Sequence, residues 1–164
     1  MIQKDFKNAK ILIVDDLATN IDILTILLKA EGYTNIKTTT DPREVMGFIT
    51  SFDPDLILLD LIMPQISGFD VMELLLSEQQ KSSKPSKRQP IMVLTSDTTT
   101  ETKQKALAFG AKDFLTKPFD SIEISYRIKN LLETQYLYQK LNSRNLLLEE
   151  KIIEFLKAND EWYR

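Results

Sequence analysis

The chain has 164 residues, of which 43% are hydrophobic and 27% are charged, and its formal net charge at pH 7 is -3. This composition is typical of a soluble globular protein, and the slightly acidic balance gives no support to nucleic acid as a direct partner. No apolar stretch approaches the roughly 18 residues of a membrane span, and residues 1–10 lack the apolar segment of a secretory signal. The sequence has no Cys and no His, which excludes disulfides, thiol chemistry and imidazole ligands, and we expect a cytoplasmic protein.

Short apolar runs of β type alternate with segments of helical period. In chain order, the sequence predicts a strand at 10–16, a helix at 20–31, a strand at 36–41, a helix at 43–52, a strand at 55–60, a helix at 68–80, a strand at 90–96, a helix at 100–109 and a strand at 113–119. Parallel strands need a crossover connection, and apolar strands need cover on both faces. The alternation therefore predicts an α/β fold with a parallel sheet and helices on both of its faces.

Carboxylates close two of the predicted strands. Asp60 ends the aliphatic run LILL, and Asp15 and Asp16 end the first strand. In the flavodoxin-like strand order 2-1-3-4-5, strands 1 and 3 are neighbours, and the ligand crevice lies outside their carboxyl ends. Three carboxylates at one place repel one another unless a cation lies among them. Hard oxygen ligands favour Mg²⁺, or Mn²⁺, completed by waters and a main-chain carbonyl.

Strands 4 and 5 bring two further polar groups to the same edge, Thr95 and Lys117. A hydroxyl, a fixed cation and a metal around one free carboxylate would neutralise a phosphoryl group transferred to Asp60, which is therefore the candidate nucleophile. Each residue alone has an ordinary explanation, because a Lys-Pro pair is usually a turn and a strand-terminal Thr is usually a solvated end. The prediction depends on their joint position at the carboxyl ends of strands 1, 3, 4 and 5.

Four stretches, LIVDDLATN, LILLDLIMPQISGFDVMELL, PIMVLTS and GAKDFLTKPF, resemble in order and spacing the signature stretches of the receiver domains of two-component response regulators. The resemblance runs from about Lys10 to about Leu132 and implies a receiver domain over residues 1–132. It implies that Asp60 accepts a phosphoryl group from a sensor histidine kinase, a phosphotransfer protein or a small phosphodonor. It further implies a signalling switch, not an enzyme beyond slow self-dephosphorylation.

The same resemblance assigns roles to the other residues. Asp16 would bind Mg²⁺ directly, Asp15 would help through water, and the main-chain carbonyl of Ile62 would be a further ligand. Lys117 would contact the phosphoryl oxygens and Thr95 would move to meet them. The resemblance also implies a cis Lys117–Pro118 bond and a rotamer change of Phe114 when Thr95 moves, although Phe114 could instead be an ordinary core aromatic. Ile62 and Asp97 occupy positions that influence the phosphoryl lifetime in similar proteins, and the length of that lifetime stays open here.

The loop MPQISG follows Asp60 and Leu61-Ile62 directly. Pro64 bars continuation of the strand, and Gly68 allows a tight backbone turn before the next helix. The loop can thus bring a main-chain oxygen to the metal, although Pro and Gly at this spacing are also plain turn chemistry.

The last helix is expected to continue beyond the receiver, because no Gly or Pro follows Pro118. A heptad pattern places Leu131, Tyr138, Asn145, Ile152 and Asn159 at a, and Thr134, Leu141, Leu148, Phe155 and Trp162 at d. Residues 133–164 are therefore predicted to form a coiled-coil helix that makes a homodimer, while a helix folded back on its own receiver or an amphipathic tail remain alternatives. We expect a longer regulator, because this helix resembles the connector of regulators that carry cyclic-nucleotide enzymes, including HD-GYP phosphodiesterases of cyclic di-GMP.

Two other classes of protein remain open. A Mg²⁺-dependent phosphatase with an Asp nucleophile would share Asp60, but the haloacid-dehalogenase type has a second Asp two residues later, where this sequence has Ile62. A phosphorylation-independent dimerisation module would be expected to show gaps in the acidic set, and the set is complete.

Overall fold

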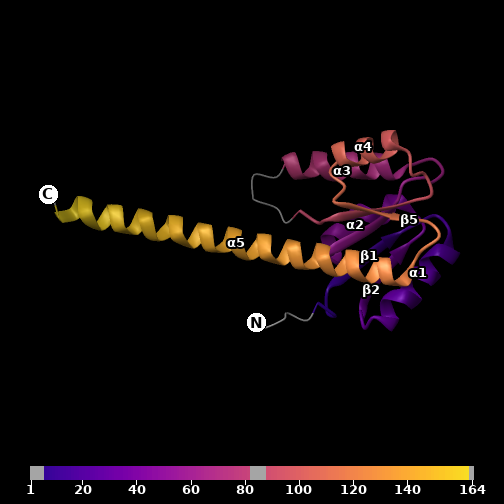
Figure 1. The fold of residues 1–164 in the computed structure, drawn as a ribbon. Helices are drawn as coiled ribbons and strands as arrows, with labels where there is room; N and C mark the ends of the chain where they lie inside the picture. The colour runs from indigo at the N-terminus through magenta and orange to yellow at the C-terminus, as the bar shows by residue number, and fades with distance from the viewer. Residues whose placement is uncertain (1–5, 82–87, 163–164) are drawn as a thin grey trace. The chain divides into compact units, whose positions relative to one another are not determined.

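The computed structural model describes residues 6–81 and 88–162, with side chains as far as Asn159 in the last helix. Strands and helices alternate along the chain (Figure 1). The elements are β1 (Lys10–Val14), α1 (Ala18–Ala30), β2 (Asn35–Thr39), the 3₁₀ turn η1 (Pro42–Glu44), α2 (Val45–Ser51), β3 (Leu56–Asp60), α3 (Gly68–Lys81), β4 (Ile91–Thr95), α4 (Thr100–Ala108), β5 (Asp113–Thr116) and α5 (Ser121–Trp162).

The strands form one parallel sheet in the order β2-β1-β3-β4-β5, which confirms the predicted flavodoxin-like topology. The register aligns Val14 with Leu59, Asp60 with Leu94, and Thr95 with Thr116. The carboxyl ends of β1, β3, β4 and β5 consequently lie at one edge of the sheet, and the loops that follow them share that edge.

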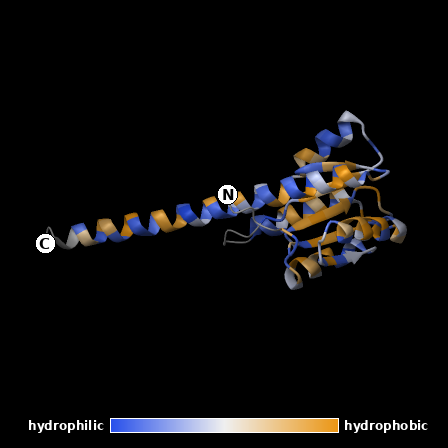
Figure 2. Cartoon of the chain, turned by 60° about the horizontal axis from the view of Figure 1, so that its bottom comes forward, coloured by the Kyte–Doolittle hydropathy of each residue, from blue (hydrophilic) through white to orange (hydrophobic). Residues whose placement is uncertain are grey.

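Each face of the sheet carries its own hydrophobic core. Ile11 and Ile13 of β1 pack with residues of α1 and α5, whereas Leu12 and Val14 pack with residues of α2, α3 and α4. In Figure 1, α1 and the first part of α5 lie on one side of the sheet, with α3 and α4 on the other. The apolar strands in the middle of Figure 2 thus have helices on both faces, as their nearly continuous apolar sequence predicts.

Element boundaries differ from the predicted ones where local chemistry intervenes. The helix predicted over 43–52 begins as the 3₁₀ turn η1, because the Asp41 side chain accepts from the Arg43 N–H at 2.9 Å and Pro42 supplies a fixed φ. The strand predicted over 113–119 ends at Thr116, since Pro118 cannot donate to a sheet. The Lys117–Pro118 bond is cis, as expected.

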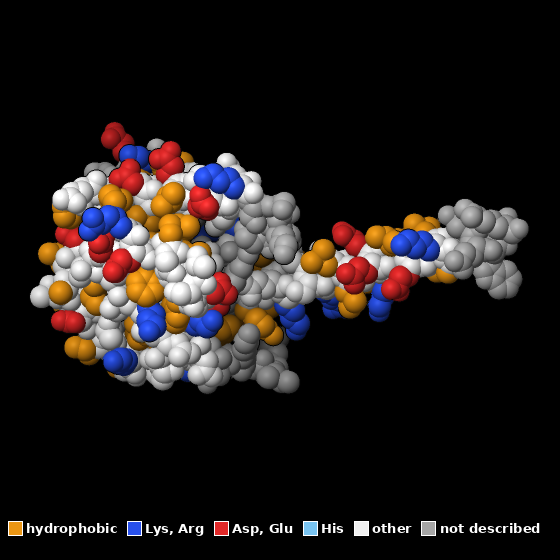
Figure 3. All heavy atoms as spheres, turned by 180° about the vertical axis from the view of Figure 1, so that it is seen from behind, with side chains coloured by type: hydrophobic (Ala, Val, Ile, Leu, Met, Phe, Trp, Pro, Cys, Tyr) orange, Lys and Arg blue, Asp and Glu red, His pale blue; other side chains and the backbone are white. Residues whose placement is uncertain are grey.

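Helix α5 passes through two compact units of the chain, Met1–Leu132 and Glu133–Arg164. In the first unit, Ile124, Ile128 and Leu132 are buried in the core beside α1. In the second unit, many large apolar side chains are 51–66% exposed. They belong to Leu137, Tyr138, Leu141, Leu146, Leu147, Leu148, Ile152, Ile153, Phe155 and Leu156. Figure 3 shows such side chains interspersed with charged ones on this unit. None of the helices within the described ranges is long and apolar enough to cross a bilayer.

Candidate functional site

Three carboxylates gather at the carboxyl edge of the sheet. Asp15 and Asp16 follow β1, Asp60 ends β3, and one oxygen from each lies within 4.8 Å of the others. Asp15 and Asp60 are only 0% and 3% exposed, while Asp16 is half-buried. Burial of two like charges is costly unless a cation compensates for them. The cluster therefore offers hard oxygen donors and a concentration of negative charge, and both suit Mg²⁺.

Lys117 supplies a cation from the protein itself. It follows β5, and its Nζ lies 2.9 Å from Oδ2 of Asp15 and 3.1 Å from Oδ1 of Asp60. Burial disfavours the ammonium form, but the bonds to Asp15 and Asp60 outweigh burial and raise the pKa of Lys117 above its ordinary value. Lys117 therefore stays charged and links the ends of β1, β3 and β5.

The carboxyl group of Asp60 has a pKa well above its ordinary value. Burial, together with the charge of Asp15, raises its pKa from 3.8 to about 6, although Lys117 and the N–H of Ile62 act in the opposite direction. The Ile62 N–H donates to Oδ1 of Asp60 at 3.3 Å. A bound divalent cation would favour the ionised form, which is the nucleophilic one.

Asp15 is held in place by a residue that the sequence analysis missed. The Asn20 side chain donates to both carboxylate oxygens of Asp15 at 3.1 Å, and the Leu17 N–H donates to Oδ1 at 3.0 Å. Asn20 lies in the first turn of α1, which begins at Ala18, earlier than predicted. The sequence does contain a signal for this role, because Asn20 ends the stretch LIVDDLATN, five residues after Asp15.

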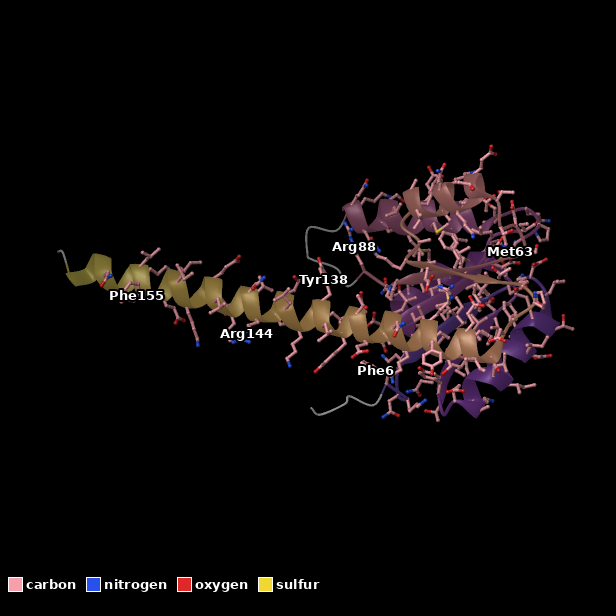
Figure 4. The ribbon with its side chains drawn as sticks, viewed as in Figure 1. Phe6, Met63, Arg88, Tyr138, Arg144 and Phe155 are labelled. Carbon is pink, nitrogen blue, oxygen red and sulfur yellow. The ribbon has the colours of Figure 1, made fainter. Side chains whose placement is uncertain are left out.

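The loop after β3 packs tightly against Asp60. A Cβ atom on Gly68 would lie 2.3 Å from the main-chain oxygen of Asp60, so only glycine fits there. The tight turn of this loop lies at Gln65, which has a φ of 70°. Gly68 is therefore required by close backbone approach and not by a left-handed φ. Met63, labelled in Figure 4, is buried in the core and fixes the middle of the loop, and the carbonyl of Ile62 stays a predicted ligand.

Thr95 and Phe114 lie on the neighbouring strands. Thr95 is 1% exposed and directly follows Leu94, the residue that pairs with Asp60. Its hydroxyl is bonded to the main chain of Asp97: it accepts from the Asp97 N–H at 2.9 Å and donates to the Asp97 carbonyl at 3.2 Å. Phe114 is half-buried and packs against the core on the α3 and α4 side of the sheet. The predicted movements of both residues stay predictions.

Comparisons with known proteins agree with this architecture. The model of the response regulator receiver domain matches residues 11–129. The chain is 33% identical over 137 residues to the transcriptional regulatory protein YvrH of Bacillus subtilis. The aligned residues make up 84% of this chain and 54% of YvrH. It is 31% identical over 137 residues to the response regulator PleD of Caulobacter vibrioides, covering 84% of this chain and 29% of PleD. The chain thus spans about half of the one relative and under a third of the other.

A solved structure shows the same fold. The Vibrio cholerae chemotaxis protein CheY4 superposes with a TM-score of 0.67 at 30% sequence identity, over 76% of this chain and 98% of CheY4. The sequence match, the strand order and the acidic cluster at the carboxyl edge lead to one conclusion: the chain belongs to the family of response regulator receiver domains.

Proposed function

We propose that the protein is a phosphorylation-activated switch of a two-component system, with Asp60 as the phosphoryl acceptor. Receiver domains are phosphorylated by histidine kinases or phosphotransfer proteins. One observation carries the assignment to Asp60: this buried carboxylate lies 3.1 Å from the ammonium of Lys117 and within 4.8 Å of Asp15 and Asp16. Such a site can balance the charge of a phosphoryl group that arrives from a partner.

In the proposed reaction, an oxygen of ionised Asp60 attacks the phosphorus of a phosphohistidine on the partner. The new P–O bond forms, the P–N bond breaks, and the imidazole leaves with the electron pair. Lys117 compensates charge on the transferred group, and the Thr95 hydroxyl donates a hydrogen bond to it. Mg²⁺ or Mn²⁺, held by Asp15, Asp16, Asp60 and the main-chain carbonyl of Ile62, would neutralise the phosphoryl oxygens.

The alternative of an Asp-nucleophile phosphatase is less well supported. Rapid turnover would need a group that activates water beside the acyl phosphate. Ile62, two residues after Asp60, has an apolar side chain that is 65% exposed and offers no such group. We therefore propose a phosphoacceptor with slow self-dephosphorylation and no further enzymatic activity in these residues. Since the sequence has no Cys, a reducing compartment suits it, and we propose a cytoplasmic location.

We further propose that residues 133–164 act as a connector that forms a parallel coiled-coil homodimer. The apolar side chains of this unit, at 51–66% exposure, need a partner to remove them from water. Asn145 falls at a central a position of the heptad, where a matching Asn favours parallel, in-register pairing. This dimer would transmit the state of Asp60 to whatever the helix carries, and the HD-GYP type of output remains a hypothesis.

The proposed acceptor is tested by intact-mass spectrometry of the full chain after incubation with acetyl phosphate and Mg²⁺. We expect the mass of one phosphoryl group on the wild-type protein and none on the Asp60→Asn variant. Asp22→Asn, an exposed site on α1, is the matched control and should be labelled like the wild type. Equal labelling of Asp60→Asn would transfer the acceptor role to another residue.

A further inference from the structure

The Asn20 side chain occupies the position from which Asp15 could chelate a cation. Its Nδ2 donates to Oδ1 and to Oδ2 of Asp15, at 3.1 Å in each case. A group that is hydrogen-bonded to both oxygens of a carboxylate, at equal distances from them, lies where a bidentate metal ion would lie. Asn20 and an ion chelated by Asp15 therefore exclude each other.

The remaining acceptor sites of Asp15 are occupied as well. The Leu17 N–H donates to Oδ1 at 3.0 Å, and Nζ of Lys117 donates to Oδ2 at 2.9 Å. A carboxylate offers about four lone-pair sites, and these two bonds together with the two from Asn20 account for all of them. An ion could therefore bind Asp15 directly only if one of these donors left.

The other two carboxylates of the cluster differ from Asp15 in their hydrogen bonding. In Asp60, Oδ1 meets Nζ of Lys117 at 3.1 Å and the Ile62 N–H at 3.3 Å. Within the described parts of the chain, no hydrogen bond or ion pair is made to Oδ2 of Asp60 or to the Asp16 carboxylate. These oxygens are open to an ion, which would thus have few protein ligands and several waters. Mg²⁺ usually keeps several waters in this way, whereas Ca²⁺ takes roughly six to eight oxygen ligands, often from chelating carboxylates.

Asn20 is itself held by the main chain of the same turn. Its N–H donates to the Leu17 carbonyl at 3.0 Å, while the Leu17 N–H binds the Asp15 carboxylate. The side chain is half-buried in the first turn of α1. Because its amide is neutral, Asn20 satisfies the buried carboxylate without adding a positive charge that would repel a metal ion.

We propose that Asn20 is a positioning residue that makes the acidic site selective for Mg²⁺ over Ca²⁺. By binding both oxygens of Asp15, it prevents this carboxylate from chelating the ion. Mg²⁺ accepts a shell of few protein ligands, whereas Ca²⁺ gains most from an additional bidentate carboxylate. The selectivity rests on the proposed function, because the ion concerned is the one that would assist phosphoryl transfer to Asp60.

Asn20→Leu tests the selectivity, because it keeps the branched shape of the side chain and removes its donors. Calorimetric titration of the full chain with Mg²⁺ and with Ca²⁺ gives a Kd for each ion. In the variant, Ca²⁺ should bind about tenfold more tightly, while the Kd of Mg²⁺ should change by at most about twofold. Asn20→Ala removes the same donors without added bulk and should show the same shift. Thr19→Val, at an exposed position of the same turn, should bind both ions like the wild type.

Luminescence of Tb³⁺, a substitute for Ca²⁺, gives the second measurement, because its lifetimes in H₂O and D₂O report the number of waters on the ion. Both Asn20 variants should hold fewer waters on Tb³⁺ than the wild type does, since the Asp15 carboxylate replaces them. An unchanged or lower preference for Ca²⁺, including an equal loss of both ions, or an unchanged number of waters would overturn the role of Asn20 while leaving Asp60 as acceptor. If the wild type binds no Mg²⁺, or acetyl phosphate labels Asp60→Asn like the wild type, the proposed function itself fails.

Discussion

Gly68 and Asp60 approach so closely that a side chain at position 68 cannot be accommodated. A Cβ atom there would lie 2.3 Å from the main-chain oxygen of Asp60 and 2.9 Å from Cα of Leu61. Gly68→Ala must therefore displace the backbone that carries the acceptor carboxylate. We expect a loss of about 1–3 kcal/mol in the free energy of unfolding, as for other overpacked sites, and weaker phosphorylation by acetyl phosphate.

Gly47→Ala is the matched control for this prediction. Gly47 is exposed within α2, and an added Cβ would meet nothing within 4 Å. The same change of residue should stabilise the protein there by about 0.5–1 kcal/mol, because alanine favours the helix. Urea unfolding measures both variants, and equal effects at the two positions would show that the close approach at Gly68 is unimportant.

Removal of the Lys117 ammonium should have opposite effects on metal binding and phosphorylation. Lys117 now compensates the charges of Asp15 and Asp60 at 2.9 and 3.1 Å. In Lys117→Met the carboxylates lose this competitor for a cation, so calorimetry should show tighter Mg²⁺ binding. Labelling by acetyl phosphate should fall at least tenfold, because a charge contact to the phosphoryl group is lost. Lys129→Met, an exposed change on α5 with the same loss of charge, should alter neither quantity, and a similar response of the two variants would refute a specific role of Lys117.

The raised pKa of Asp60 predicts that, in the absence of metal, this residue destabilises the folded protein to an extent that depends on pH. Its carboxyl group has a pKa of about 6 in the folded protein and an ordinary value of 3.8. Between these values the folded state holds more protons than the unfolded one, so stability is lost as pH rises through about 6. In EDTA, Asp60→Asn should therefore be more stable than the wild type at pH 7.5, by on the order of 2–3 kcal/mol.

The stability that Asp60→Asn gains over the wild type should shrink as the pH falls from about 6 toward 4, where Asp60 is protonated in the folded wild type. Thermal unfolding of both proteins at several pH values measures this difference in stability. Added Mg²⁺ should narrow the difference at pH 7.5 by stabilising the wild type selectively. A difference that stays constant from pH 4 to 7.5 would be incompatible with a raised pKa of Asp60.

The strand order and the acidic edge could be predicted because their signals are local. Asp15 and Asp60 end nearly continuous apolar runs, and parallel topology brings such ends together. Asn20 escaped prediction because α1 begins at Ala18 after Leu17, an N-cap whose side chain makes no capping bond. The usual polar start signal is therefore missing, and the sequence pattern predicts a helix that begins only at Asn20.

Other parts of the site depend on conformations that no pattern of residue types encodes. The close approach of Gly68 to Asp60 follows from the path of the loop, including the left-handed backbone at Gln65. Likewise, the sequence places Thr95 at the end of β4, but the direction of its hydroxyl depends on the turn that carries Asp97.

The connector makes its own prediction about helix pairing. In a parallel, in-register coil the d positions face each other, so Leu148→Cys should form a disulfide-linked dimer under mild oxidation. Leu147→Cys is a matched control, because both leucines are 51% exposed but Leu147 falls outside the a and d positions. Light scattering should also show weaker association for residues 1–132 than for 1–164. Equal cross-linking at 147 and 148, or equal association of the truncated chain, would contradict the parallel coil.

Localisation of the phosphoryl group tests the central claim most directly. The full chain is treated with acetyl phosphate and Mg²⁺, the acyl phosphate is reduced with borohydride, and peptide mass spectrometry finds the carboxylate that has become homoserine. The buried carboxylate beside Lys117 predicts modification at Asp60 alone, and its loss when Mg²⁺ is replaced by EDTA. Modification at Asp15, Asp16 or Asp97 instead, or none at any carboxylate, would contradict the assignment of Asp60 as the phosphoryl acceptor.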